Sequence, residues 1–147
     1  MRIVLQRVKE ACVTVGGEAV GRIGKGLLVF LAVAKGDTAH EADRLVDKVL
    51  ELRVFEDSGG KMNLCARDVN AEFLVVPQFT LYGDCRKGRR PSFDAAAEPR
   101  QGEELYEHFV ARLKNSKVTV ASGRFRAMME VALVNDGPVT LILDADH

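Results

Sequence analysis

Several features that mark large protein classes are missing from this sequence of 147 residues. No apolar run approaches the roughly 20 residues that a bilayer-spanning helix needs, and the opening MRIVLQRVKE lacks the apolar segment and cleavage site of a secretory signal. The 3 cysteines, Cys12, Cys65 and Cys85, are widely separated and odd in number, which argues against a disulfide framework. No cysteine and histidine stand at zinc-ligand spacing. We therefore expect a cytoplasmic protein with no membrane contact and no bound metal.

An excess of charge of one sign is also missing, because 21 Lys and Arg residues balance 21 Asp and Glu residues. A neutral chain does not bind polyanions through bulk charge. One local exception exists, where Arg86, Lys87, Arg89 and Arg90 place four cations in five positions. This segment is either a solvated loop or a set of phosphate contacts.

The apolar patterns that are present predict a strand-rich single domain over residues 1–147. Gly16 and Gly17 stand between two alternating segments as a hairpin signal, and residues 27–34 form an apolar run typical of a strand buried on both faces. The predicted strands cover residues 2–8, 11–15, 19–23, 27–34, 72–79, 118–121, 128–134 and 139–143. We expect an α/β fold, in which two main helices pack on a mixed, strongly curved, barrel-like β-sheet.

Two segments between these strands carry helix signals. Thr38 and Glu41 have the spacing of a capping box, and the apolar residues after them recur at helical spacing. Pro99 marks the approach to a second helix, and Leu105 and Phe109 lie on its apolar face. Residues 57–60 read as a turn, and the polar tail over residues 144–147 is expected to fray.

Two short motifs place a proline inside a run that otherwise reads as a strand. They are PQFTLYGD over residues 77–84 and NDGPVT over residues 135–140, whose Gly137-Pro138 pair the pattern places in the connection between the last two strands. Proline removes a ladder hydrogen bond, and the pair Gly137-Pro138 combines close backbone approach with the only common route to a cis peptide. Each motif is either an edge strand with a bulge or backbone geometry built for a ligand.

Residues for nucleophilic catalysis are scarce. A Cys85–His108 dyad is conceivable, because Arg86 and Lys87 would lower the pKa of the thiol, but a plain loop thiol fits the sequence as well. No GxSxG or HExxH motif is present. Thr80 is the one hydroxyl at a strand end inside a proline motif, where it could also bond its own backbone. An enzyme with this sequence would therefore position a substrate and stabilise the transition state with backbone dipoles.

The chain resembles the D-aminoacyl-tRNA deacylases, also called D-tyrosyl-tRNA deacylases, over nearly its whole length. The order and spacing of the matching segments make the resemblance specific, although several are weak alone. They are Gln6-Arg7-Val8, Gly24, Gly26, FEDSGGKMN over residues 55–63, QFTL over residues 78–81, RRPSF over residues 89–93, GRF over residues 123–125 and LVNDGPVT ending at Thr140.

The resemblance implies hydrolysis of the ester between a D-amino acid and the 3′-terminal adenosine of tRNA by a cytoplasmic homodimer without cofactor or metal. It implies that Gln78, Phe79 and Thr80 line the ester as catalytic residues, while the substrate's own 2′-hydroxyl assists the reaction. Pro77, a predicted substrate contact, stands where the family usually has serine, and a related deacylase group with altered selectivity also carries proline there.

The resemblance also implies a Gly-cisPro element at Gly137-Pro138, which would enter the partner's active site and exclude L-side chains. Since glycine has no side chain to exclude, we expect glycyl-tRNA to be cleaved as well. Phe125 and Met129 match positions that bound the terminal adenosine, with core packing as the plainer reading. The acceptor-stem phosphates would be the partners of Arg86, Lys87, Arg89 and Arg90.

Three other functions compete with this interpretation. The chain could be a non-catalytic module that binds the end of tRNA, a cysteine esterase that uses Cys85, or a structural domain of a larger assembly. A hydrolysis assay separates the first from an enzyme, and Cys85→Ser separates the second.

Overall fold

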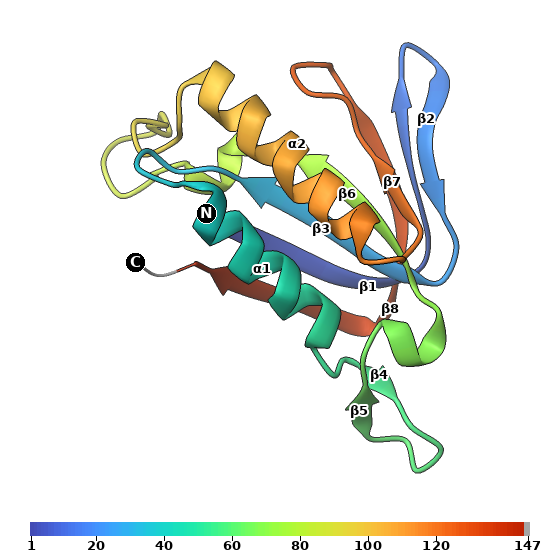
Figure 1. Ribbon diagram of the computed structural model, residues 1–147. Coiled ribbons are helices and arrows are strands. Elements are labelled where there is room, and N and C mark those ends of the chain that lie inside the picture. The colour runs from blue at the N-terminus through green and yellow to red at the C-terminus, as the bar shows by residue number, and fades with distance from the viewer. Residues whose placement is uncertain (146–147) are drawn as a thin grey trace.

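The computed structural model describes residues 1–145, in which eight strands and four helical segments follow one another (Figure 1). The end of the predicted polar tail, Asp146 and His147, lies outside the described residues. In chain order the elements are β1 (Arg2–Val15), β2 (Glu18–Ile23), β3 (Gly26–Ala32), α1 (Ala39–Glu51), β4 (Phe55–Glu56), β5 (Met62–Leu64), the 3₁₀-helix η1 (Arg67–Val69), β6 (Glu72–Pro77), the 3₁₀-helix η2 (Phe79–Tyr82), α2 (Pro99–Asn115), β7 (Val120–Ser122) and β8 (Glu130–Asp144).

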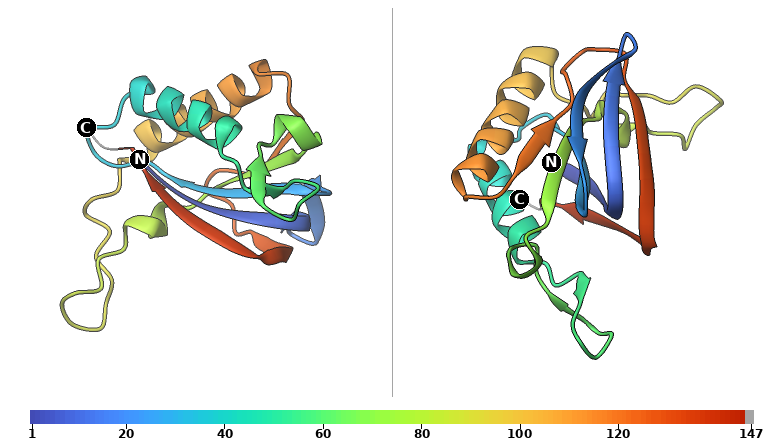
Figure 2. Two further views of the ribbon diagram at one scale, coloured as in Figure 1. Left: turned by 90° about the horizontal axis from the view of Figure 1, so that it is seen from below. Right: turned by 90° about the vertical axis from the view of Figure 1, so that its right-hand side faces the viewer.

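The main sheet is mixed, as predicted. β1 pairs antiparallel with β3 through its first half, with β2 through its second half, and with β8 along its other edge. β3, β6 and β7 continue the sheet in parallel. A Cβ atom on Gly21 would lie 2.7 Å from the carbonyl oxygen of Ser122, so glycine lets β2 approach β7. The sheet thereby curls into a nearly closed barrel (Figure 2).

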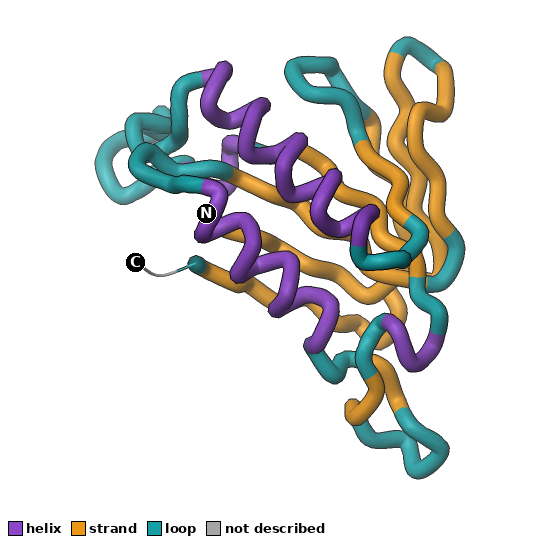
Figure 3. Tube along the Cα trace, viewed as in Figure 1, coloured by secondary structure: helices purple, strands orange, loops and turns teal. Residues whose placement is uncertain are grey.

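Both helices lie side by side on one face of this sheet (Figure 3). α1 begins at the predicted capping box, with Thr38 as its N-cap and Glu41 bonded back to the Thr38 backbone, an arrangement that contributes about 1 kcal/mol. α2 begins with Pro99 in its first turn, as predicted, and buries Phe109 and Leu113 against the sheet. No helix in the described part of the chain is long and apolar enough to cross a membrane.

Two apolar clusters fill the two sides of the sheet. Leu27 and Phe73 face the helices, whereas Leu28 and Leu74 face the interior of the curled sheet. Because successive side chains of a strand point to opposite faces, β3 and β6 are buried on both sides. This explains the continuous apolar run over residues 27–34, and it confirms the predicted two-sided burial.

Several predicted boundaries are wrong. Residues 2–8 and 11–15 form the single strand β1, because bulges in its pairing with β8 absorb the break in alternation. β6 ends at Pro77 rather than at residue 79 because η2 begins there. The turn predicted over residues 57–60 is present, and it joins the two strands of the small hairpin β4–β5, which was not predicted. Asp144 belongs to β8 and pairs with Arg2, so the tail does not fray at this residue.

The two predicted C-terminal strands are also continuous. Both belong to β8, and Gly137-Pro138 lies inside this strand rather than in a connection. Gln6 of β1 pairs with Thr140 and Val8 pairs with Asn135, so residues 136–139 stand opposite Arg7 alone. We call residues 136–139 the Gly-Pro bulge. Its Gly137–Pro138 peptide bond is cis, which confirms that prediction.

Candidate functional site

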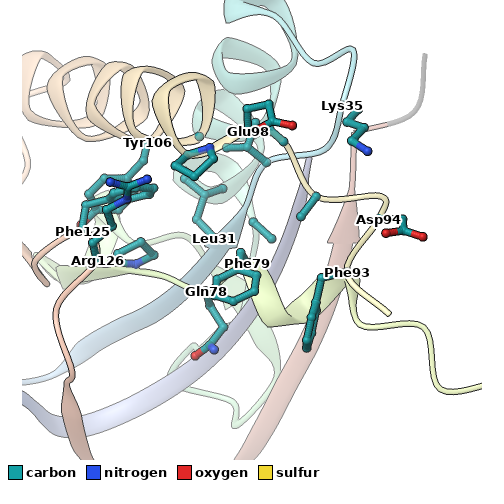
Figure 4. Close-up of a pocket in the computed structure, with 17 residues that line it drawn as sticks. Leu31, Lys35, Gln78, Phe79, Phe93, Asp94, Glu98, Tyr106, Phe125 and Arg126 are labelled. Carbon is teal, nitrogen blue, oxygen red and sulfur yellow. The ribbon is translucent and has the colours of Figure 1, made fainter. Parts of the chain in front are cut away.

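An apolar cavity of about 440 Å³ opens where the ends of β3 and β6 meet the start of α2 (Figure 4). Figure 4 shows Phe125 and Arg126 on one side of this cavity, with Phe93, Asp94 and Lys35 on the other. The cavity brings together the predicted site residues Pro77, Gln78, Phe79 and Phe125. The full lining is Leu31, Ala32, Val33, Lys35, Pro77, Gln78, Phe79, Phe93, Asp94, Ala96, Ala97, Glu98, Pro99, Gly102, Tyr106, Phe125 and Arg126.

The QFT segment reaches the cavity because it continues β6 beyond the sheet. The Gln78 N–H donates to the Leu31 carbonyl at 2.8 Å, and the chain then turns into η2. Phe79 stays 58% exposed, and its ring packs edge to face with the Phe93 ring at 5.2 Å between centroids. An aromatic side chain left this exposed beside an apolar cavity offers a contact surface for a ligand.

Thr80 is placed differently from its two neighbours. Its side chain does not line the cavity, and its hydroxyl accepts a hydrogen bond from the Gln78 side-chain amide. The N–H groups of Phe79 and Thr80 lie in the first turn of η2, where a helix leaves its first donors without an internal partner. The backbone, rather than the Thr80 hydroxyl, is thus the better-placed source of donors at this end of the cavity.

The opposite wall is built on Tyr106 of α2. The Tyr106 hydroxyl donates to the Val75 carbonyl at 2.8 Å, and burial raises the pKa of this hydroxyl, which keeps it neutral. Phe125 packs beside it with 6.2 Å between ring centroids. The Gly123 N–H also donates to the Val75 carbonyl, at 2.8 Å, which ties the loop after β7 to β6. Phe125 is therefore positioned both by its packing against Tyr106 and by the hydrogen bond that ties its loop to β6.

Met129 lies behind this wall and not in the cavity. Its sulfur accepts the Arg124 N–H at 3.4 Å, and a Cβ atom on Gly123 would come within 2.8 Å of the same sulfur and 3.3 Å of Pro77. Met129 also packs against the inner apolar cluster of the curled sheet. In this chain its side chain supports the wall that carries Phe125.

The four clustered cations lie on an extended loop, residues 84–92, which we call the basic arm. Mutual backbone bonds of 2.7 and 2.9 Å between Asp84 and Ser92 close its base, and Figure 2 shows it projecting from the body. Arg86 donates twice to the Asp84 carboxylate, at 2.9 and 2.7 Å, and these bonds lower the pKa of Asp84 to about 2. Lys87, Arg89 and Arg90 stay exposed at the tip.

The Gly-Pro bulge lies apart from the cavity of its own chain. It borders a separate, polar cavity of about 560 Å³ lined by Arg7, Lys9, Lys25, Phe55, Glu56, Val134, Asn135, Asp136 and Gly137. The structure therefore brings Gln78, Phe79 and Phe125 together but leaves Gly137 and Pro138 elsewhere on the same subunit.

Two polar side chains hold the Gly-Pro bulge by its main chain. The buried Arg7 donates to the Asp136 carbonyl at 2.9 Å and to the Val54 carbonyl at 2.6 Å. The Asn135 side chain accepts from the Val139 N–H at 2.8 Å and donates to the Val139 carbonyl at 3.2 Å. Gly137 has φ +140°, and a Cβ atom there would lie 2.9 Å from Val139 and 3.1 Å from Arg7. Only glycine fits this position without strain.

The residues of the alternative cysteine site do not come together. Cys85 is exposed on the basic arm, whereas His108 on α2 pairs with Asp43 of α1 at 2.8 Å. Several cavity residues are not predicted as site residues by the sequence, among them Lys35, Glu98, Tyr106 and Arg126. They come from different elements that only the fold brings together, and no local motif marks them.

Comparisons with known proteins agree with one another. Residues 4–144 match the family model described as D-Tyr-tRNA(Tyr) deacylase. The chain is 59% identical over 146 residues to a D-aminoacyl-tRNA deacylase of Halothermothrix orenii, covering 99% of this chain and 98% of the relative. It is 57% identical over 145 residues to a D-aminoacyl-tRNA deacylase of Thermotoga petrophila, covering 99% and 97%.

Two solved structures share the fold. A protein described as c-Myc DNA Unwinding Element Binding Protein matches with a TM-score of 0.93 and 40% identity, covering 100% of both chains. A probable eukaryotic D-amino acid tRNA deacylase matches with a TM-score of 0.83 over 97% of both chains, and at 19% identity this likeness bears on the fold alone.

Proposed function

The chain belongs to the D-Tyr-tRNA(Tyr) deacylase family, and from this membership we propose that it hydrolyses the ester of D-aminoacyl-tRNA to free D-amino acid and tRNA. The observation that carries the proposal is the convergence of Gln78, Phe79 and Phe125, all from motifs matched to that family, on one apolar cavity. A cavity of this kind, with a few polar groups at its edge, suits a nucleoside ester. The reaction would take place in the cytoplasm.

In the proposed reaction, water adds to the ester carbonyl, and the ribose 3′-oxygen leaves with a proton. The negative charge that develops on the carbonyl oxygen needs donors already in place. The N–H groups of Phe79 and Thr80 serve this role, since they stand at the start of η2 beside the cavity. The 2′-hydroxyl of the substrate relays the proton, and this role is consistent with the absence of a histidine among the described residues that line the cavity.

The role of the Thr80 hydroxyl is tested by Thr80→Val. Because this hydroxyl is turned to the Gln78 amide, we expect kcat on D-tyrosyl-tRNA to fall less than about tenfold. A loss beyond roughly a hundredfold, the effect of removing an oxyanion donor, would show that the hydroxyl itself acts on the carbonyl. Thr119→Val, at an exposed threonine just before β7, is the matched control.

Selection against L-amino acids is assigned to the Gly-Pro bulge of a partner subunit in a homodimer. Within one chain the bulge is separate from the apolar cavity, so it could act there only from a second copy. Val134 and Ile142, which are 45% and 68% exposed on β8 beside the bulge, support an association through this face. Main-chain atoms cannot move away as a rotamer can, so they would exclude every L-side chain.

The same exclusion makes glycine a substrate, because glycine has no side chain to reject. We expect glycyl-tRNA to be deacylated at enzyme concentrations that clear D-tyrosyl-tRNA. Survival of glycyl-tRNA under these conditions would contradict exclusion by the Gly-Pro bulge.

The basic arm is proposed to contact phosphates of the acceptor stem. Lys87, Arg89 and Arg90 are exposed at its tip, whereas the charge of Arg86 is partly matched by Asp84. Neutralising the three tip cations should weaken tRNA binding and flatten its salt dependence. The preference for D over L should not change. An unaltered salt slope would remove the arm from the interface.

The deciding experiment compares D-tyrosyl-tRNA and L-tyrosyl-tRNA with the purified protein and a chelator. We expect the D-ester to be lost and the L-ester spared. Loss of both would mean that Pro77 or the Gly-Pro bulge has relaxed the selection. If tRNA binds but neither ester is cleaved, the chain is a binding module. Cys85→Ser should remain fully active, and its inactivity would favour the cysteine esterase.

A further inference from the structure

The loop between β7 and β8 carries an arrangement that the proposed reaction does not use. We call residues 123–129, GRFRAMM, the rim loop. Phe125 and Arg126 both line the apolar cavity, so a cation stands directly at its mouth. Two positions further on, Met128 is 89% exposed, the highest exposure among the large apolar side chains described.

The rim loop is held in shape before any ligand arrives. Its first residue, Gly123, bonds to Val75 of β6, and the Ala127 N–H donates to the Arg124 carbonyl at 3.2 Å to close a turn. Arg126 adopts a left-handed conformation with φ 63°, which is uncommon for a residue with a side chain. A non-glycine residue held in this region is often part of a ligand site.

The rim loop also carries charge that none of the described residues neutralises. Neither Arg124 nor Arg126 takes part in an ion pair with residues 1–145. By contrast, Arg2, Arg7, Arg86, Arg100 and Arg112 are among the arginines that form ion pairs. Arg126 at the cavity mouth, Arg124 two residues before it and the exposed thioether of Met128 therefore make the surface of the rim loop basic and apolar at once.

We propose that the rim loop binds the single-stranded nucleotides that precede the terminal adenosine of tRNA. This inference rests on the proposed function. A terminal adenosine seated against Phe125 must carry its 5′-phosphate out through the cavity mouth, where Arg126 meets it. The preceding cytidine base packs on the Met128 side chain. Proteins bind single strands by this combination of backbone cations and exposed base-packing side chains.

The basic arm is a poorer candidate for the same nucleotides. It leaves the body beyond Phe93, whereas Phe125 and Arg126 lie on the opposite side of the cavity in Figure 4. Its length suits a contact with phosphates farther along the acceptor stem. The two basic segments would thus bind different parts of one tRNA, and their substitution should affect different substrates.

A series of substrates of increasing length tests the rim loop. Kinetics are measured on D-tyrosyl-adenosine, on the D-tyrosyl ester of the trinucleotide cytidine–cytidine–adenosine, and on D-tyrosyl-tRNA. For the wild type we expect kcat/KM to rise from the adenosine ester to the trinucleotide ester. Arg126→Gln should lower kcat/KM on the trinucleotide ester about fivefold more than on the adenosine ester, the scale of one exposed charge contact. Its salt slope on the trinucleotide should fall by about 0.7.

Two further variants make the test specific. Met128→Ala should raise KM for the trinucleotide ester without changing kcat, and Lys87→Gln on the basic arm should change only the reaction with full tRNA. If Arg126→Gln keeps the whole gain, or if it slows the adenosine ester equally, the inference is wrong. If Met128→Ala alters subunit association but leaves KM unaltered, Met128 belongs to a protein interface instead.

Failure of the proposed function can be told apart from failure of this inference. If the wild type cleaves none of the three esters, the proposed function is wrong. Binding of the trinucleotide without an attached amino acid, titrated into the wild type and into Arg126→Gln, then still tests the rim loop. Weaker binding by the variant supports the rim loop as a single-strand site, and equal binding overturns it.

Discussion

The apolar cavity and the Gly-Pro bulge are built in opposite ways. Strand ends and packed rings of Tyr106, Phe125 and Phe93 form the cavity wall, so many small contacts fix each residue. The Gly-Pro bulge is an interruption of β8, and Arg7 and Asn135 hold it through its main chain. A wall of many contacts tolerates the loss of one, whereas a segment held by two side chains does not.

Gly137→Ala should have the largest effect on selectivity, because it changes the Gly-Pro bulge, which is held by few contacts. Its Cβ atom would meet Val139 at 2.9 Å in a backbone conformation that alanine rarely adopts. We expect the ratio of the D-ester to the L-ester rate to fall about a hundredfold, as for a catalytic element displaced by roughly 1 Å. The measurement is deacylation of both tyrosyl-tRNAs.

Gly17→Ala is the control for backbone strain alone, since Gly17 has φ +83° but nothing within 4 Å of an added Cβ atom. It should keep the wild-type ratio. If Gly137→Ala discriminates as well as this control, the Gly-Pro bulge does not set selectivity.

Arg7→Lys should come next, as a loss of stability. A single ammonium group cannot bond the Asp136 and Val54 carbonyls in the geometry of the guanidinium. One buried carbonyl would lose its charged donor, and we expect the free energy of unfolding in urea to fall by about 2 to 3 kcal/mol. Arg22→Lys, an exposed cation on β2, should change nothing. Equal unfolding midpoints for both variants would show that Arg7 does not hold the bulge.

Tyr106→Phe should be milder, although it removes a buried hydrogen bond in the cavity wall. The Val75 carbonyl would keep its bond from the Gly123 N–H, so no buried acceptor is left unpaired. We expect a loss of about 0.5 to 1 kcal/mol in the free energy of unfolding, with activity retained. Tyr82→Phe is the matched control, since its hydroxyl bonds no described residue. A loss above roughly 2 kcal/mol would mean that the wall depends on single contacts, as the bulge does.

Gly102→Ala should have the smallest effect and the opposite sign. The added Cβ atom would lie 3.5 Å from Phe125, an ordinary van der Waals contact. Alanine inside a helix is favoured over glycine by about 0.5 to 1 kcal/mol, so α2 and the whole protein should be stabilised by this amount in thermal unfolding. A lower melting temperature would show that the packing between α2 and Phe125 cannot accommodate an added methyl group.

The sequence predicts the cavity wall better than the bulge's supports, for a physical reason. The apolar runs of β3 and β6, the capping box at Thr38 and the start of α2 at Pro99 are local signals, and each is found in the structure. The QFT segment follows β6 directly, so its place at a sheet end could be predicted from the strand before it.

The supports of the Gly-Pro bulge are not local. Arg7 reads as one more polar residue in a strand, and nothing near it shows that it is buried opposite four residues of β8. Two predicted strands became one for the same reason, because a bulge keeps the chain in the sheet where the pattern shows a break. Arg126 and Tyr106 reach the cavity only through the packing of α2 and the loop after β7.

The bonding of Arg7 to carbonyl groups has an evolutionary consequence. Main-chain oxygens are the same in every amino acid, so residues 54 and 136 can change their side chains without losing the hydrogen bonds from Arg7, and residue 136 would lose only the ion pair of its carboxylate at 3.8 Å. Position 7 has no such freedom. Methods that infer contacts from correlated substitutions would therefore find little signal between these three positions, although one guanidinium joins three distant segments of the chain.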